Sequence, residues 1–334
     1  MPGVRLNSYC NIATESSPGT PVAPTRQLQM QVEGLLDIDY GLNFHENENR
    51  GVRTKIVRTP TSQSEDVDLS IETITGIGYD DLILFWAEFN GTATAVGGSA
   101  DKTWTQSPNM GASISPKAFT LDVGDEIQNW RTQYTQWSSI QLKASRGGLT
   151  QLSATGFAQR ALKVAKSTSA ASTAPVMIPG DIWTIKFATT QAGLTGASVV
   201  SNFLLDWDLT LDTGIRRRHY ADGNLYFGQT VEAGDISGTL NLTVEATAQA
   251  VTQFFDKYAN QSLDFIRLKA TGPLLGSSNY SETIDLPVFY DKPSIISGEQ
   301  DGVNVWKIPA RLAYDSTSSK SVQLVTVAAL TALP

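Results

Sequence analysis

The chain has 334 residues, of which 41% are hydrophobic and 17% are charged, so it can bury a sizeable core and is folded rather than disordered. Its formal net charge of −8 argues against wrapping nucleic acid on a basic patch, because such binding depends on neutralising phosphates. The single cysteine, Cys10, excludes an internal disulfide, so stability needs no oxidising compartment.

The start of the chain resembles neither a signal peptide nor a membrane anchor. It lacks the apolar core of a secretion signal, and the sequence nowhere contains the roughly 18 consecutive apolar residues of a transmembrane helix. We therefore expect synthesis in a cytoplasm and no membrane partner. With Pro18, Pro21 and Pro24, residues 1–29 predict an extended N-terminal arm that is poorly packed on a lone subunit and ordered by neighbours.

An internal repeat suggests the domain organisation. Leu-Leu-Asp-Ile-Asp at 35–39 recurs as Leu-Leu-Asp-Trp-Asp at 204–208, which is 169 residues later. Next, 69–72 matches 242–245, and 84–89 matches 253–258 at the same offset of 169. Three matches in the same order indicate a duplicated domain. We expect the following segments: a first domain at 30–164, a linker rich in small residues and Pro at 165–180, a second domain at 181–327 and a C-terminal tail at 328–334.

Apolar and polar residues alternate as in β-strands in both copies. Every second residue is apolar from Leu36 to Phe44 and again from Leu205 to Leu211. Residues 66–72 and 239–245 repeat the pattern. A period of two means that one face of the strand buries against a core while the other meets water. Further strands are predicted at 119–123, 139–143, 263–268 and 303–312.

One helix is predicted in each copy. Residues 79–89 begin with acids suited to a helix N-terminus and place their apolar side chains on one face. In the second copy, the matching face carries Val251, Phe254, Phe255 and Tyr258. A helix of this kind would close the end of a sandwich, so the expected fold class is mainly β, with two tandem β-sandwich domains and one flanking α-helix in each. The small residues at 92–100 predict a mobile loop.

The polar positions of the alternating strands form an acidic face in both copies. One interpretation is an ordinary solvated outer sheet. The other is a channel lining, in which carboxylates keep a polyanion from adhering. The residues concerned are Asp37, Asp39, Asp66, Asp68, Glu72, Asp206, Asp208, Asp212 and Glu245.

A basic segment follows the first alternating strand of each copy. It is either a solvated hairpin tip or a contact between protein subunits, and its recurrence at an equivalent place supports the second possibility. The residues are Arg50, Arg53, Lys55 and Arg58 in the first copy, and Arg216, Arg217 and Arg218 in the second.

The sequence contains no recognisable catalytic or cofactor motif. His45 and His219 fall in expected loops without further metal ligands at a fixed spacing, and Cys10 has no basic neighbour to activate it. Neither a nucleophile elbow nor a phosphate-binding loop occurs. The carboxylate pair Asp37 and Asp39 recurs with strand spacing, which indicates a shared face rather than a glycosidase. We expect no enzyme, no metal and no cofactor.

The second copy resembles a known family along most of its length. Its motif starts with the alternating strand Leu204–Asp212, continues with an Arg-rich hairpin that contains Gly-Asn-Leu-Tyr-Phe-Gly, and ends with Ser-Gly-Thr-Leu-Asn-Leu-Thr-Val-Glu at 237–245 before an aromatic helix. This pattern resembles the major tail tube proteins of long-tailed, non-contractile bacteriophages. The first copy follows it more loosely, since 51–61 lacks the Gly-x-Leu-Tyr step.

The resemblance implies a tail-tube-like β-sandwich whose sheet joins its neighbours around a ring, closing a β-barrel. Rings of six such domains would stack into a tube, so a chain with two domains implies three copies per ring. The expected partners are the protein itself, other tail proteins and genomic DNA that passes the lumen during ejection without specific binding. The expected location is the virion tail, after synthesis in the bacterial host cytoplasm.

Two alternatives stay open at this point. The chain is a tube subunit of a tailocin or secretion system, or it is an adhesive or carbohydrate-binding β-sandwich protein of a virion surface. Tube proteins polymerise into hollow rods, whereas adhesins remain small oligomers.

Overall fold

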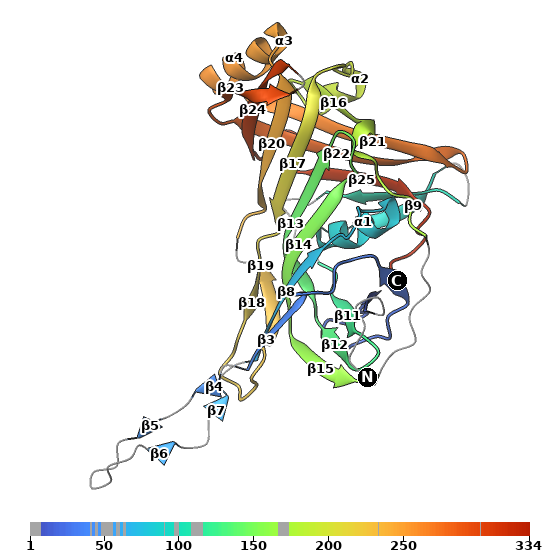
Figure 1. Cartoon of the computed structure of the whole chain (residues 1–334), viewed down its shortest axis with the longest axis vertical. Helices are drawn as coiled ribbons and strands as arrows, with labels where there is room; N and C mark the ends of the chain where they lie inside the picture. Colours follow the sequence, from blue (N-terminus) through green and yellow to red (C-terminus); the bar gives the residue numbers. More distant parts are fainter. Residues whose placement is uncertain are drawn as a thin grey trace.

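The protein is mainly β, as expected, with antiparallel sheets and a few short helices (Figure 1). The computed structural model describes residues 8–40, 42–43, 46–47, 56–57, 61–62, 65–89, 91–96, 100–107, 116–165, 174–232, 234–300 and 302–334.

One continuous sheet crosses both halves of the chain. Its first seven strands are, in spatial order, β3 (Leu36–Asp39), β8 (Asp66–Glu72), β14 (Gln151–Ala158), β13 (Gln136–Ser145), β17 (Leu204–Asp212), β20 (Ser237–Glu245) and β24 (Val303–Leu312). The halves meet in the β13–β17 ladder, where residues 139–145 pair antiparallel with 206–212. The regions expected as two separate domains therefore share a sheet.

The remaining strands of this sheet form a second layer around β22 (Ser278–Tyr290). Strand β22 pairs with β21 (Asp264–Leu275), with the end of β24 and with β25 (Gln323–Ala328). A second connection between the halves arises here, because β25 pairs with β10 from the first half. The other strands are β10 (Lys102–Gln106), β9 (Gly91–Ala95), β16 (Trp183–Ala188) and β23 (Ser294–Gln300). Strand β9 occupies part of the loop expected at 92–100.

The N-terminal segment is not a loosely packed arm. It supplies two strands of a five-stranded sheet with the order β15 (Arg160–Val164), β12 (Asn129–Gln133), β11 (Phe119–Gly124), β1 (Tyr9–Thr14) and β2 (Arg26–Leu28). Cys10 and Ile12 of β1 are buried in the main core. The expectation for residues 8–28 was wrong because β1 is covered on both faces and so shows no period-two pattern.

The expected linker and C-terminal tail are also packed where they are described. Ile178 is fully buried and exchanges backbone hydrogen bonds with Thr150 and Ile77. At the chain end, the Trp104 indole donates to the carbonyl of Leu330 at 2.9 Å, and the Thr14 N–H donates to the carbonyl of Pro334 at 2.5 Å. Both segments therefore belong to the folded body.

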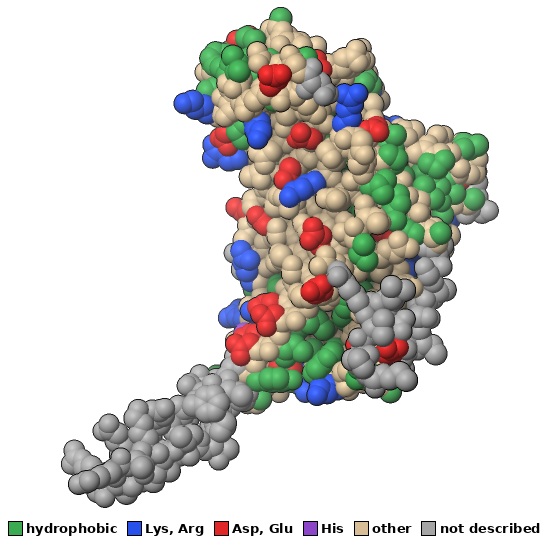
Figure 2. Space-filling view, viewed as in Figure 1, with side chains coloured by type: hydrophobic (Ala, Val, Ile, Leu, Met, Phe, Trp, Pro, Cys, Tyr) green, Lys and Arg blue, Asp and Glu red, His purple; other side chains and the backbone are tan. Residues whose placement is uncertain are grey.

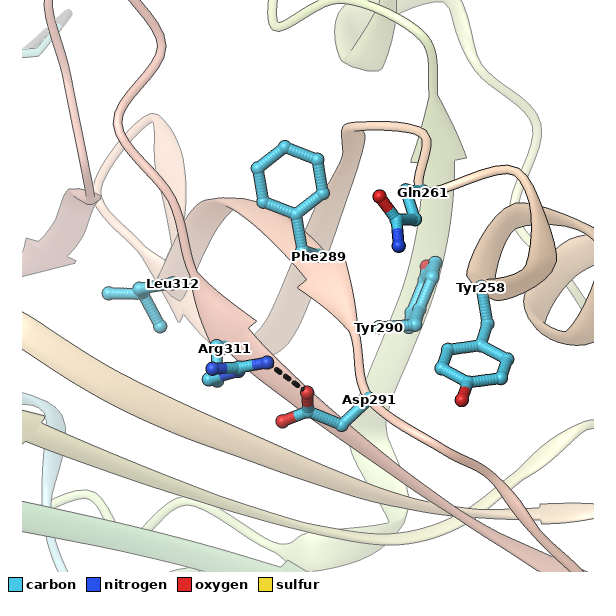
Figure 3. Close-up of a pocket in the computed structure, with 7 residues that line it drawn as sticks. All are labelled: Tyr258, Gln261, Phe289, Tyr290, Asp291, Arg311 and Leu312. Carbon is cyan, nitrogen blue, oxygen red and sulfur yellow. Dashed lines mark hydrogen bonds and ion pairs between the residues drawn. The ribbon is translucent and has the colours of Figure 1, made fainter.

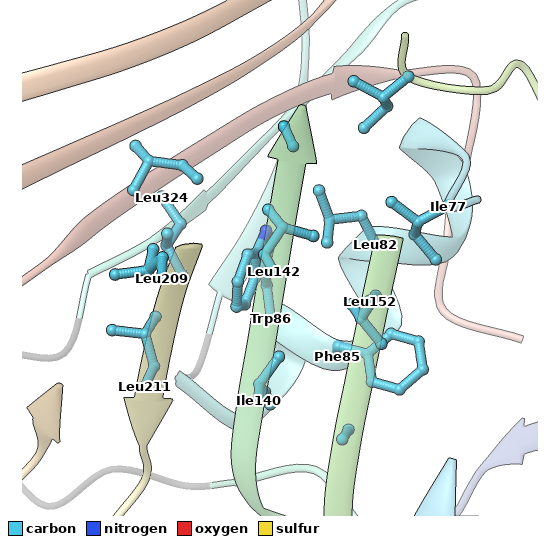
Figure 4. Close-up of a cluster of buried hydrophobic side chains, with 14 of the residues drawn as sticks. Ile77, Leu82, Phe85, Trp86, Ile140, Leu142, Leu152, Leu209, Leu211 and Leu324 are labelled. Atoms are coloured by element: carbon cyan, nitrogen blue, oxygen red, sulfur yellow. The ribbon is translucent and has the colours of Figure 1, made fainter. Parts of the chain in front are cut away.

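The first predicted helix lies inside the core instead of flanking it. It consists of α1 (Tyr79–Trp86) and the 3-10 turn η2 (Ala87–Phe89), and every residue in it is buried. Phe85 packs against Trp137 of β13 with ring centroids 5.2 Å apart, and Leu82 and Trp86 face the same cluster (Figure 4). This helix is enclosed by strands from distant parts of the chain, which a one-faced apolar pattern does not reveal.

Buried polar contacts connect this helix to four other elements. The Trp86 indole donates to Glu282 of β22 at 3.1 Å, and Glu88 accepts the Trp137 N–H at 2.7 Å. Asp81 pairs with Arg26 of β2 at 2.6 Å, while Asp80 accepts the N–H of Leu330 at 2.7 Å. The helix thus links both sheets and the C-terminal segment.

The second predicted helix is interrupted and only partly buried. It comprises α3 (Ala248–Ala250), the π-helical η4 (Val251–Phe255) and α4 (Asp256–Ala259). Phe254 is buried against Phe203, with ring centroids 5.7 Å apart, whereas Val251 and Phe255 are each 40% exposed. The expected four-residue apolar face is wrong at those two positions.

The remaining short elements are η3 (Gly180–Ile182), α2 (Gly193–Gly196) and the hairpin ladders β18 (Ile215–Arg218) with β19 (Gln229–Glu232), β4 (Leu42–Asn43) with β7 (Thr61–Ser62), and β5 (Glu46–Asn47) with β6 (Ile56–Val57).

Glu282 predicts a pH dependence of stability. Burial raises the pKa of this carboxyl from 4.5 to about 8, although Trp86 and Thr326 donate hydrogen bonds to it. Between these values the unfolded carboxyl ionises while the folded one keeps its proton. Its contribution to stability is therefore complete at low pH and decreases as the pH rises towards 8.

Glu282→Gln should flatten this dependence by on the order of 1 kcal/mol per pH unit, measured by urea unfolding across the same window. Glu72→Gln, which changes an exposed carboxylate of β8, is the control and should leave the slope unchanged. Equal slopes in wild type and Glu282→Gln would contradict the assignment.

Candidate functional site

All nine acids singled out from the sequence lie on one face of the continuous sheet. Residues directly opposite each other in neighbouring antiparallel strands project from the same side. Asp37 and Asp39 lie opposite Asp68 and Asp66. One row of opposite residues then crosses the sheet from β8 to β24 through Glu72, Ser153, Gln141, Thr210, Thr239 and Arg311.

The opposite face of these strands is the core. On β17, for example, Trp207, Leu209 and Leu211 are buried while Asp206, Asp208 and Thr210 alternate with them. The polar face, which we call the polar sheet face, carries Ser, Thr, Asn and Gln side chains between its carboxylates, four of which face one another across β3 and β8. Figure 2 shows acidic side chains distributed over this region of β8, β14, β13, β17 and β20.

The polar sheet face is acidic on balance but not uniformly so. Lys143, Lys307 and Arg311 occupy positions on it among the nine carboxylates. Asp208 accepts two hydrogen bonds from the Gln141 amide at 2.9 Å, and the Lys143 ammonium lies 3.8 Å from it. Isolated contacts of this kind at a solvent-exposed surface contribute little stability, so the face keeps its acidic character.

The basic segment of the second half meets this acidic face within the same chain. Arg217 of β18 lies 3.3 Å from Asp66 and 3.0 Å from Asp68, and His219 lies 3.2 Å from Asp66. Arg216 and Arg218 are exposed, and Arg218 stacks over the Tyr220 ring at 5.4 Å. Sequence reasoning did not anticipate that the two proposed sites touch. The first-copy residues Arg50, Arg53, Lys55 and Arg58, with His45, lie outside the described residues.

A small aromatic cluster fixes this hairpin to the first half. Phe227 is buried against Phe157 of β14 and Tyr134, with ring centroids 5.6 and 5.4 Å away. The Gln159 amide donates to the carbonyl of Phe227 at 2.8 Å. The sequence signal for this contact was Phe157, an aromatic residue at a polar-face position of β14. We call the first-half members of this group, Tyr134, Phe157 and Gln159, the hairpin receptor.

The described residues show no arrangement that resembles a reactive centre. Burial raises the pKa of the Cys10 thiol to about 12, so it is not nucleophilic at neutral pH. Within the described ranges, no three metal-ligating side chains gather, and none of the helices is long and apolar enough to cross a membrane.

A comparison with protein families identifies the family of the chain. A family model described as phage tail tube protein matches residues 6–315. The chain belongs to the phage tail tube protein family. A comparison with individual curated proteins found no match. This tail tube protein is therefore a non-enzymatic structural component of the virion tail, and tail tube proteins act by polymerising.

The hairpin contact yields a stability prediction. Phe227→Ala removes the hairpin ring that packs on the receptor, so it should cost about 3 kcal/mol of unfolding free energy or release the hairpin locally. Hydrogen exchange of 215–232 should rise strongly, whereas Leu225→Ala, at a side chain of the same hairpin that is 40% exposed, should leave it near the wild-type level. Unchanged protection in Phe227→Ala would show that the cluster does not hold the hairpin.

Proposed function

We propose that three copies of this chain close into a ring, that rings stack into the tail tube, and that the polar sheet face lines the lumen through which DNA is ejected. The observation that carries the proposal is the strand order of the continuous sheet. The first half contributes β3, β8, β14 and β13 in that order. The second half repeats the order with β17, β20, β24 and then β23 together with the end of β22.

This order supports a duplicated four-strand unit, with the β13–β17 ladder as the joint between units. The two outer strands of this sheet, β3 and β23, each have one unpaired edge among the described strands. Strand β3 pairs only with β8 among the described strands, and β23 pairs only with β24. All seven residues of β23 are exposed, including Ile295 and Ile296. Pairing β23 of one copy with β3 of the next repeats the internal joint and removes both open edges.

Three chains then supply the six units expected for a ring of this family. In the closed sheet, the core-side face is already covered by α1, the five-stranded sheet and the layer of β21 and β22. Those layers belong on the outer wall, which leaves the polar sheet face for the lumen. Exposed Arg216 and Arg218 remain proposed contacts between copies.

The chemistry of the polar sheet face suits passing DNA. DNA carries about one charge per 1.7 Å of its axis, so a basic wall would bind it at many points. Carboxylates set among Ser and Thr side chains repel phosphates and keep DNA from adhering, which favours sliding. A tailocin or secretion tube would use the same ring, but no observation favours it over a DNA-conducting tail, and none favours an adhesin.

The ring joint predicts the effect of charges on β23. Ile295→Lys with Ile296→Lys should leave the melting temperature of the monomer nearly unchanged, because both side chains are largely exposed, yet abolish ring formation in sedimentation velocity. Leu274→Lys, at a 71% exposed side chain outside the joint, is the control and should assemble normally. Normal assembly of the double variant would refute the β23 edge.

The lumen assignment predicts a defect in DNA passage. Replacing Asp37, Asp206, Asp212 and Glu245 together by Lys should leave tubes intact but slow or stall DNA ejection from phage particles that carry the variant. The matched Asn and Gln variants should fall between it and wild type, because they remove repulsion without adding attraction. Wild-type ejection by the Lys variant would show that these residues do not face DNA.

A further inference from the structure

The second half of the chain holds an open groove beside α4. The groove has a volume of about 560 Å³ and is lined by Tyr258, Gln261, Phe289, Tyr290, Arg311 and Leu312. Phe289 of β22 is 43% exposed, and its ring stands clear of the other lining side chains (Figure 3). An ion pair between Arg311 and Asp291, 2.5 Å apart, lies beside it.

This groove lies at the same place in its unit as the hairpin receptor does in the first half. The matching residues Glu72 and Glu245 lie opposite Ser153 of β14 and Val305 of β24. Ser153 and Val305 are therefore equivalent positions. Four residues further along each strand, Phe157 corresponds to Pro309, and six residues further, Gln159 corresponds to Arg311.

The partner strand gives the same correspondence. Gln136 lies opposite Phe157, and the Asp291 N–H donates to the carbonyl of Pro309 at 2.8 Å. Two residues before Gln136 and Asp291 stand Tyr134 and Phe289, both aromatic. Phe289 therefore occupies the position of Tyr134.

The first-half receptor is filled, whereas its counterpart is open. The hairpin that follows β17 covers Tyr134 with Phe227, and the Tyr134 hydroxyl lies 3.2 Å from that of Thr230. No described segment covers Phe289 in this way. The difference follows from the order of the strands. Strand β17 pairs with β13 of the first half, so the hairpin that follows β17 packs on the first half. The corresponding hairpin after β3, whose base is the β4–β7 ladder, has no such unit within its own chain.

We propose that the groove around Phe289 receives the hairpin following β3 of a second copy of this chain. This rests on the proposed ring, in which β3 of that copy pairs with β23. The hairpin then reaches the neighbouring β24 and β22 as the β18–β19 hairpin reaches β14. Phe289 and Leu312 supply the apolar contact, and the Arg311–Asp291 pair supplies polar partners. Each joint of the ring thus gains a side-chain contact in addition to a backbone ladder.

The groove contact can be tested with a single reactive cysteine. Gln261→Cys adds an exposed thiol to the groove lining, at a side chain that the proposed contact does not use, in a chain whose native Cys10 is buried and unreactive. Maleimide should label it rapidly in the monomer and at least about tenfold more slowly in purified rings, since labelling then requires local opening. Ring formation is followed separately by native mass measurement, and the melting temperature of the variant checks its fold.

A second variant identifies the segment that covers the groove. Gln261→Cys is combined with replacement of residues 42–62 by a short turn, which leaves β3 and β23 in place. Rings of this variant should label at nearly the monomer rate. Rapid labelling in rings of the full-length variant would overturn the groove contact while leaving the ring intact. Slow labelling in rings that lack the hairpin would show that another segment covers the groove. If the full-length chain stays monomeric, both the ring and the groove contact are overturned.

Discussion

The antiparallel ladder between β13 and β17 is the contact on which the architecture depends. It joins strands from the two halves of the chain, so that one sheet and one hydrophobic core run through both. Because antiparallel partners project to the same side, the ladder also aligns the acidic positions of both halves on a single face. Among the described strands, β3 and β23 each have one unpaired edge, and in the proposed ring these two edges form the same kind of ladder between neighbouring copies.

The two faces of that sheet have opposite roles. The apolar face is covered by α1, whose buried polar side chains reach residues 55, 196 and 250 positions away in the sequence, at Arg26, Glu282 and Leu330. Such contacts fix the helix against both sheets. The polar sheet face carries short polar side chains and carboxylates, which suit the proposed lumen.

The strands that are buried on one face only could be predicted from the sequence, because their apolar and polar residues alternate. The alternation in 36–39, 66–72, 204–212 and 239–245 predicts β3, β8, β17 and β20, and with them an acidic face in each half. That the two faces are one depends on the β13–β17 ladder, which the sequence does not reveal. Prediction failed where an element is buried all round or depends on distant residues. Strand β1 reads as a polar arm because both of its faces are covered, and α1 reads as amphipathic because its remaining neighbours come from the second half. The contact of Arg217 with Asp66 and Asp68 was likewise not visible, because it depends on Phe227 docking near β8.

The number of chains in one ring is the most direct test of the account. Native mass measurement of rings assembled from the purified protein gives the number of chains per ring. Averaged end-on images of the same rings give the position of the sheet. The account predicts three chains per ring, six similar densities around the axis, and an inner wall formed by the polar sheet face. Six chains per ring, or an inner wall formed by the five-stranded sheet, would contradict it.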